Sequence, residues 1–227
     1  SIYENGAKVI FLNINLLLDS GINKDQYLHK IEIIPNGVDE SLFTGTKNKK
    51  SHEIIFSGNL QRFQKGRGLE FIISSFSNKS MPEEYTLKVI GGPSYEVKRL
   101  KEHVAKLGLK NKIEFLDRID RNLTISNIER ASFGLLINSS ENLHSIKYSS
   151  PLKYFEYLYA GLKVIAINFP SHTILPFADN ISFFEENDQK SFIKAIENSC
   201  TLEPINKKDL VNITMDSRVN KIISLIN

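Results

Sequence analysis

The sequence predicts an α/β protein built on a doubly wound, Rossmann-like parallel sheet with helices on both faces. From residue 52 onward, short strand-like runs alternate regularly with helical patterns. The strand-like runs are apolar almost throughout, which is typical of parallel strands that are buried on both faces. Gly, Asn or Asp bounds these runs, and the helical patterns between them suit crossovers from one parallel strand to the next. Together these observations indicate the fold class.

The expected elements of the sheet domain follow one another in a simple order. The strand-like runs cover residues 53–58, 86–92, 112–119, 133–139, 163–168 and 181–184. The helical patterns cover residues 69–76, 95–107, 123–129, 151–160 and 191–199. Because all strands of such a sheet run in one direction, the loops that follow them gather at one edge, where ligands bind.

The chain divides into three regions, of which residues 51–204 form the sheet domain. In residues 1–50, strand-like runs at 8–13 and 30–35 flank a short helical pattern at 14–20. The polar, lysine-rich stretch at 45–51 is expected to be a linker. In residues 205–227, an amphipathic stretch at 218–226 follows a polar spacer and is expected to pack elsewhere.

Composition and charge limit the class of protein. The 227 residues are 41% hydrophobic and 24% charged, as in ordinary globular proteins. A net charge of +3 without a nucleic-acid-binding motif argues against nucleic acid as a partner, although it is compatible with anionic ligands or lipid head groups. Cys200 is the only cysteine, which excludes a disulfide framework and favours the cytoplasm. No apolar run approaches the roughly 20 residues of a membrane span.

The helical pattern at 151–160 has a well-marked start and end. Ser150 is expected to be its N-cap, Pro151 to occupy its first turn, and Gly161 to take the left-handed position just past its end. Lys153 lies in the first turn, where a cation faces the positive end of the helix dipole at a cost of roughly 0.3–1 kcal/mol. A bound anion removes this cost, and a helix start with free N–H groups and a nearby lysine is a phosphate site.

Glu156 follows one turn later, on the same face of the helix as Lys153. A carboxylate in this position is well placed to accept hydrogen bonds from the hydroxyl groups of a ribose. The alternative is a surface ion pair between Lys153 and Glu156, with no ligand.

The loop at 58–68, which follows the first strand of the sheet, combines glycines with cations. Gly58 and Asn59 open the loop, and its cations are Arg62, Lys65 and Arg67. Glycine allows a ligand to approach the backbone, and Arg or Lys neutralises a diphosphate. The spacing matches neither a P-loop nor the dinucleotide-binding motif. The alternative is a solvated basic loop.

Other loops at the same edge carry weaker signals. Gly91 and Gly92 end a strand and suit a tight turn beneath a flat ligand, although a plain strand-to-helix turn fits as well. Arg118 lies at the end of the next strand, where backbone groups can read a nucleobase edge. Glu141 and His144, in the polar loop before the helix at 151–160, can face a transferred group. The alternative for His144 is a solvated side chain.

Several motifs resemble the retaining GT-B glycosyltransferases, in particular glycosyltransferase family 4. The run SSPLKYFEYLYAG (149–161), followed by KVIAIN (163–168), is similar to the donor-binding motif of that family. Before it come IIPNGVD (33–39), IIFSGNL (54–60), LKVIGG (87–92) and KIEFLDRI (112–119), in the order found in the family. The resemblance extends from residue 33 to about residue 199.

The resemblance implies that the chain is mainly the C-terminal, nucleotide-sugar-binding half of a two-domain enzyme. The residues before Ile33 then correspond to the last strand and helix of an N-terminal domain. The final helix corresponds to one that crosses back to pack on that domain, so this N-terminal domain is an implied partner. The chain alone is expected to be inactive.

The resemblance also implies roles for individual residues. Glu156 would bind the ribose hydroxyls, and the backbone at Pro151 and Leu152 would bind the diphosphate. The family's arginine and lysine match Arg62 and Lys65 approximately, because the loop is longer than usual. These cations would stabilise the leaving nucleoside diphosphate, where negative charge develops.

Two points in this assignment stay open. Arg67 competes with Lys65 for the role of the family's lysine. Tyr148 stands where the family often has a second glutamate, eight residues before Glu156, and the alternatives for holding the sugar are Glu141 and His144. The candidate catalytic residues are therefore Arg62, Lys65 and Glu156. The candidate nucleotide-binding residues are Gly58, Asn59, Arg67, Gly91, Arg118, Ser150, Pro151, Leu152, Lys153 and Glu156.

The expected activity is retaining transfer of a sugar from a UDP- or GDP-type nucleotide-sugar to a glycan or lipid-linked acceptor. No cofactor other than this donor is implied, and no metal, since no Asp-x-Asp pair appears and Arg and Lys can meet the diphosphate charge. A composition rich in Lys, Asn and Ile suggests a bacterial source. Polysaccharide or lipopolysaccharide biosynthesis in the cytoplasm, with peripheral contact to the inner membrane, would fit such a source.

Two other functions are compatible with the same fold. A degenerate GT-B-like module, kept for nucleotide binding or assembly without turnover, is conceivable because Tyr148 replaces the acid. Half of a sugar-nucleotide epimerase shares the architecture, but the sequence lacks a matching set of acid and base residues.

Overall fold

The computed structural model describes residues 5–6, 8–45, 52–62, 65–203 and 205–225, and of Lys24 and Arg62 only the backbone. Within these residues, six strands form one sheet in the order β10-β9-β8-β3-β6-β7, and all neighbouring strands are parallel. The strands are β3 (Glu53–Ser57), β6 (Thr86–Ile90), β7 (Ile113–Leu116), β8 (Phe133–Leu136), β9 (Lys163–Ile167) and β10 (Ile181–Phe184). The predicted parallel sheet is confirmed.

The chain builds this sheet outward in two directions. From β3 it proceeds through β6 to β7, then returns to the other side of β3 and adds β8, β9 and β10. The strand order therefore reverses between β3 and β8, where Ile54 pairs with Phe133 and Ile55 with Gly134. Such a reversal opens a crevice beyond the carboxyl ends of the two strands, in which α/β proteins bind ligands.

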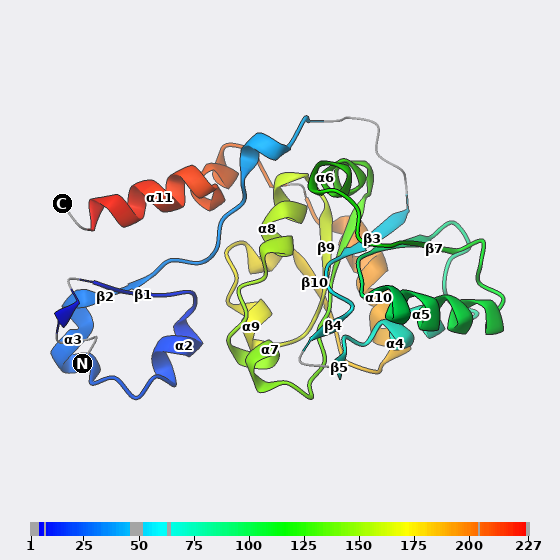
Figure 1. Ribbon diagram of the computed structural model, residues 1–227, viewed down its shortest axis with the longest axis horizontal. Helices are drawn as coiled ribbons and strands as arrows, with labels where there is room; N and C mark the ends of the chain where they lie inside the picture. The colour runs from blue at the N-terminus through cyan, green and yellow to red at the C-terminus, as the bar shows by residue number, and fades with distance from the viewer. Residues whose placement is uncertain (1–4, 7, 46–51, 63–64, 204, 226–227) are drawn as a thin grey trace.

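Helices cover both faces of the sheet, as the sequence predicts (Figure 1). One face carries α4 (Leu69–Ser75), α5 (Ser94–Lys106) and α10 (Gln189–Thr201), and the other carries α6 (Arg121–Arg130) and α8 (Leu152–Tyr159). Side chains of β3 alternate between the two cores, with Ile54 and Phe56 in the first and Ile55 in the second. Burial on both faces explains why these strands are mostly apolar.

The loops that follow the strands contain short elements that the sequence does not predict. A hairpin of β4 (Gln61–Arg62) and β5 (Lys65–Gly66) lies within the basic loop. Helix α7 (Leu143–Lys147) follows β8, and its start is capped by Asn142, whose side chain accepts from Ser145 N at 3.1 Å. Helix α9 (Pro170–Thr173) follows β9, and a 3₁₀ turn at Ala178–Asn180 precedes β10.

The N-terminal residues form a small separate unit. Strands β1 (Val9–Phe11) and β2 (Ile31–Ile33) pair in parallel, and both are shorter than the predicted runs. Between them lie α2 (Ile14–Leu18), α3 (Lys24–Tyr27) and a 3₁₀ turn at Leu28–Lys30. After a further 3₁₀ turn at Glu40–Leu42, Thr44 Oγ1 and Gly45 N donate to the carboxylate of Glu129 at 2.8 and 2.7 Å. Most of the expected linker at 45–51 lies outside the described residues.

The C-terminal helix α11 (Met215–Ser224) lies at the same end of the molecule as the N-terminal unit (Figure 1). It begins earlier than predicted because Thr214 caps it, with Thr214 Oγ1 accepting from Ser217 N at 3.1 Å. The preceding 3₁₀ turn at Asp209–Ile213 and α11 are joined to the chain at Val38, since Val38 N donates to Ile213 O at 2.8 Å and Met215 N donates to Val38 O at 2.7 Å.

Candidate functional site

A cavity of about 440 Å³ opens where the strand order reverses. It is lined by the ends of β3 and β8, by the start of α8, by residues of α7 and the segment that follows it, and by residues of the N-terminal unit. Its lining includes Leu12, Leu16, Asn36, Phe56, Ser57, Arg67, Ile137, Asn138, His144, Tyr148, Ser149, Ser150, Pro151, Leu152, Lys153 and Tyr157. The cavity therefore lies at the crevice that the topology predicts for a ligand.

The start of α8 differs by one residue from the sequence prediction. Pro151 is the N-cap and Leu152 the first helical residue, so the assignment of Ser150 as N-cap is wrong. Ser150 instead accepts from Asn36 N at 3.2 Å through Oγ, and from Asn36 Nδ2 at 2.6 Å through its carbonyl. No side chain among the described residues caps α8, so the first amides and the positive end of its dipole are available at the cavity. Gly161 has the predicted left-handed conformation, with φ 70°.

Arg67, a cation of the basic loop, lines the cavity. Its Nε and Nη2 donate to Asn138 Oδ1 at 2.9 and 2.5 Å, and its Nη1 donates to Asn59 O at 3.2 Å. The guanidinium also lies over the ring of Phe56, 6.0 Å from its centroid. These contacts hold the guanidinium in one orientation at the end of β3. Asn138, which no pattern in the sequence indicates, sets that orientation from the segment that follows β8.

Glu156 is buried one turn below the start of α8, with its side chain 4% exposed. Its Oε2 accepts from Lys153 Nζ at 2.7 Å, and its Oε1 accepts from Arg121 Nη2 at 2.7 Å. Lys153 and Glu156 therefore share a face, as predicted, and they form an ion pair that is mostly buried rather than on the surface. Arg121, the first residue of α6, is a partner that sequence reasoning missed.

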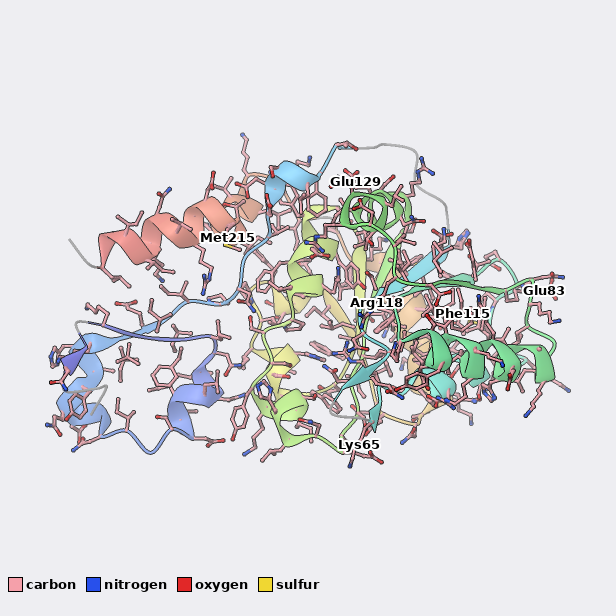
Figure 2. All side chains as sticks on the ribbon, viewed as in Figure 1. Lys65, Glu83, Phe115, Arg118, Glu129 and Met215 are labelled. Atoms are coloured by element: carbon pink, nitrogen blue, oxygen red, sulfur yellow. The ribbon has the colours of Figure 1, made fainter. Side chains whose placement is uncertain are left out.

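Lys65, a further cation of the basic loop, lies apart from this cluster. Lys65 Nζ pairs with Glu141 Oε2 at 3.2 Å, and the two side chains are 52% and 61% exposed. The side chain of Arg62 lies outside the described part of the structure. Lys65 is found at the end of the β4–β5 hairpin, whereas Arg118 lies closer to the sheet (Figure 2). Neither Lys65 nor Arg118 lines the cavity.

Gly58 and Gly91 bring two loops into close contact beside the cavity. A Cβ atom on Gly91 would lie 1.8 Å from the carbonyl oxygen of Gly58. Gly58 N donates to Ile90 O at 2.9 Å and Leu60 N donates to Gly92 O at 2.8 Å, which fixes the crossing. The absence of a side chain at Gly91 thus allows the basic loop to pack closely against the end of β6. Gly92 lies against the side chain of Arg118.

Tyr148 joins the sheet domain to the N-terminal unit at the edge of the cavity. Its hydroxyl donates to Asp19 Oδ2 at 2.6 Å, which raises the pKa of the phenol. Lys147 Nζ also lies 3.4 Å from Asp19 Oδ2. The ring of His144 packs edge-on against Tyr148, with 6.0 Å between ring centroids. His144 therefore faces the cavity, whereas the other candidate for holding the sugar, Glu141, is paired with Lys65.

His172 is a fully buried histidine in α9, behind the cavity. Its Nδ1 lies 2.8 Å from Ile167 O, and because a carbonyl only accepts, Nδ1 carries the proton. Among the described residues, Nε2 has no hydrogen-bond partner. Burial is the main cause that lowers the pKa of His172 to about 4. The Ile167 hydrogen bond opposes this decrease, and the charge of Arg67 contributes to it.

Acid is therefore expected to destabilise the protein through His172. The pKa of His172 in the fold lies below its ordinary value of about 6.5, so protonation favours the unfolded state. Stability is fully present above pH 6.5 and declines as the pH falls toward 4, by about 3 kcal/mol at most. Urea unfolding at pH 7 and pH 4.5 should show a smaller difference for His172→Asn than for the wild type. Equal pH dependence in the two proteins would contradict this account.

The described residues contain neither a cluster suited to a metal ion nor a helix suited to span a membrane. Within these residues, no group of three or more His, Cys, Asp or Glu side chains is arranged to hold a metal ion. Of the helices that the structure describes, none combines the length and the apolar character needed to cross a membrane.

The family model of the glycosyl transferases group 1 matches residues 51–201. Comparison with proteins of curated function gave no match. Among solved structures, the fold is similar to sucrose-phosphate synthase from Thermosynechococcus elongatus, with a TM-score of 0.70, 16% identity, and coverage of 99% of this chain and 59% of that one. For Anabaena Alr3699/HepE in complex with UDP, the TM-score is 0.72 at 14% identity, with coverage of 99% and 65%.

A third similar structure is the lipopolysaccharide outer core galactosyltransferase WaaB in its apo form, with a TM-score of 0.69, 12% identity, and coverage of 97% of this chain and 61% of that one. The chain thus spans 59% to 65% of the length of these three proteins. At such identities the likeness concerns the fold, while the family match extends from the segment before β3 to the end of α10. The chain therefore belongs to the glycosyl transferases group 1.

Proposed function

We propose that the chain binds a nucleotide-sugar in the cavity between β3 and β8. The observation that carries this proposal is the convergence of the open start of α8 and the guanidinium of Arg67 on one cavity. The carboxylate of Glu156 lies one turn deeper on α8, outside the cavity lining, and is bonded to Lys153, which lines the cavity. Helix amides and a guanidinium are donors for a diphosphate, and a carboxylate is an acceptor for ribose hydroxyls. Complexes of Anabaena Alr3699/HepE with UDP and with UDP-glucose, on the same fold, support this assignment.

Each candidate residue has a place in this proposal. The backbone from Ser150 to Lys153 binds the diphosphate, and Glu156 binds the ribose. Gly58 and Asn59 hold the basic loop beside the cavity, while Arg118 lies beside the path to the nucleobase. We assign the main diphosphate contact to Arg67, with Arg62 and Lys65 adding positive charge from the hairpin as the nucleoside diphosphate leaves.

We further propose that the whole protein transfers the sugar of a UDP- or GDP-type donor, with retention, to a glycan or lipid-linked acceptor. The acceptor-binding groups would come from an N-terminal domain. The apolar side chains of α11 support such a partner, since Val219 and Ile223 are 43% and 49% exposed. No metal is required when Arg and Lys meet the diphosphate charge. We place the reaction in polysaccharide or lipopolysaccharide biosynthesis, at the cytoplasmic side of the inner membrane.

One observation favours a second candidate, a nucleotide-binding module without turnover. Tyr148 stands in place of the acid that often holds the sugar in glycosyltransferase family 4, and its hydroxyl donates a hydrogen bond to Asp19. Such a module would bind nucleoside diphosphates, but the full-length protein would consume no sugar nucleotide. The transferase proposal requires that the full-length protein consumes sugar nucleotide.

A thermal-shift panel of UDP, GDP, ADP and their sugars tests nucleotide binding directly. At a ligand concentration a hundred times the Kd, binding stabilises the fold by about 2.7 kcal/mol. For a chain of this size, that corresponds to a rise in Tm of roughly 5–10 °C. If no nucleotide raised the Tm, the proposed site would be wrong.

Replacing Glu156 with Gln should remove about half or more of that rise in Tm. The substitution keeps the shape of the side chain but removes the charge that accepts from the ribose, so we expect an affinity about tenfold to a hundredfold lower. Glu102→Gln, on the exposed face of α5, is the matched control and should bind as the wild type does. An unchanged affinity in Glu156→Gln would remove Glu156 from the site.

A further inference from the structure

The carboxylate of Glu156 is held by cations from two different helices. Lys153 approaches Oε2 from the first turn of α8, and Arg121 approaches Oε1 from the first turn of α6, each at 2.7 Å. Arg121 is preceded by Asp120, the N-cap of α6, whose side chain accepts from Asn122 N at 2.7 Å. One buried carboxylate thus meets the starts of both helices.

Arg121 and Lys153 each lie in the first turn of a helix, where a positive charge alone is unfavourable. A positive side chain in the first turn of a helix faces the positive end of the helix dipole. Glu156 offsets this for both helices, and it fixes the side chains that surround it. Arg121 is 46% exposed, whereas Glu156 is 4% exposed. The guanidinium therefore reaches inward from the surface to the buried carboxylate.

Arg121 and Lys153 hold one oxygen each of the Glu156 carboxylate. An ionised carboxylate offers about four acceptor positions, of which Arg121 and Lys153 occupy two. Two acceptor positions on two oxygens match a vicinal diol, which presents two adjacent hydroxyl donors. If Arg121 were absent, Oε1 would lose its anchor and the carboxylate would be held by Lys153 alone.

We propose that Arg121 is a positioning residue that orients Glu156 for both hydroxyls of a ribose, and that the pair makes the site selective for ribonucleotides over 2′-deoxyribonucleotides. The proposal rests on the proposed function, since it takes Glu156 as the ribose ligand. Arg121 acts through Glu156, while Glu156 contacts the ribose. A site built to bond two hydroxyls discriminates against the analogue that lacks one, because a buried polar group is left unpaired.

The test compares a nucleoside diphosphate with its 2′-deoxy form by isothermal titration calorimetry. The base is the one that gives the largest thermal shift. The wild type should bind the ribose form at least about tenfold more tightly, as expected for the loss of one hydrogen bond to a charged group. In Arg121→Ala, affinity for the ribose form should fall about tenfold, affinity for the deoxy form should fall less, and the ratio should approach one. Arg121→Lys should restore part of the ratio, because it keeps the charge.

Arg130, exposed at the other end of α6, provides the matched control. Arg130→Ala should keep the wild-type ratio and affinity. A purely structural role for Arg121 would lower the Tm or weaken both nucleotides equally, leaving the ratio unchanged, and that outcome would overturn the proposal. Tight binding with no discrimination in the wild type would also overturn it while leaving the nucleotide site intact. Absence of binding by the wild type would instead refute the proposed function.

Discussion

Replacing Arg67 with Ala is expected to reduce affinity for a nucleoside diphosphate by about a hundredfold or more. The guanidinium lines the cavity and is held in place by two hydrogen bonds to Asn138 Oδ1 and by the ring of Phe56. It therefore meets a diphosphate with little further loss of side-chain freedom. Two charge-assisted hydrogen bonds contribute about 1.5–3 kcal/mol each, which supports the expected loss. Isothermal titration calorimetry measures it.

Arg67→Lys separates charge from geometry. A lysine keeps the positive charge but has neither the planar fork that binds two phosphate oxygens nor the double contact with Asn138, so it should recover only part of the affinity. Lys101→Ala, exposed on α5, serves as the control for a lost surface charge. Lys65→Ala should have a smaller effect than Arg67→Ala, since Lys65 is half exposed and paired with Glu141. If Lys65→Ala proved more damaging, Lys65 would take the role that we assign to Arg67.

The sheet could be predicted because the apolar pattern that indicates it is local to each strand. A parallel strand that is buried on both faces must be apolar along its length, and β3, β6 and β9 satisfy this almost completely. Parallel strands also place their following loops at one edge. The basic loop and the start of α8 could therefore be brought together from sequence alone, and the cavity confirms that they meet.

The contacts that shape the site could not be predicted, because they join residues far apart in the chain. Arg121 and Glu156 meet because α6 and α8 pack on the same face of the sheet, and no local pattern records that packing. Asn36 forms hydrogen bonds with Ser150, which lies 114 positions away in the chain. The side chain of Ser150, which suits an N-cap, is therefore bonded to Asn36, and Pro151 takes the N-cap position of α8. The pair Asn36-Gly37 is typical of a turn, but a turn pattern does not indicate which distant residue Asn36 will contact.

The short elements at the ligand edge were missed for a related reason. Helix α7 spans only five residues, too few for a periodic pattern. Its position is set by tertiary contacts, such as Asn15 Nδ2 donating to Lys147 O at 3.0 Å. The β4–β5 hairpin pairs only two residues on each side. Its place is set by the Gln61 side chain. The amide oxygen of Gln61 accepts a hydrogen bond from the Tyr95 hydroxyl, and its amide nitrogen donates one to Glu96; both partners lie on α5.

The largest loss of stability is expected for Gly91→Ala. The new Cβ would lie 1.8 Å from Gly58 O, and φ at this position is 156°, which disfavours any other residue. The Gly58 carbonyl cannot move away easily, because hydrogen bonds on both sides of it tie the two loops together. We expect a loss of more than about 4 kcal/mol in the free energy of unfolding, which is a large part of the 5–15 kcal/mol of a typical domain. Urea unfolding followed by circular dichroism suits a chain without tryptophan.

Gly108→Ala distinguishes the clash from the backbone conformation. Gly108 also has a positive φ, 72°, but a Cβ there would have nothing within 4 Å. Its replacement should therefore cost only the conformational strain, about 1 kcal/mol. If the two variants lost equal stability, the close approach of the loops would not explain the need for glycine at Gly91. If Gly91→Ala folds at low temperature, it should also bind nucleotide more weakly, because the displaced Gly58 carries the loop from which Arg67 reaches the cavity.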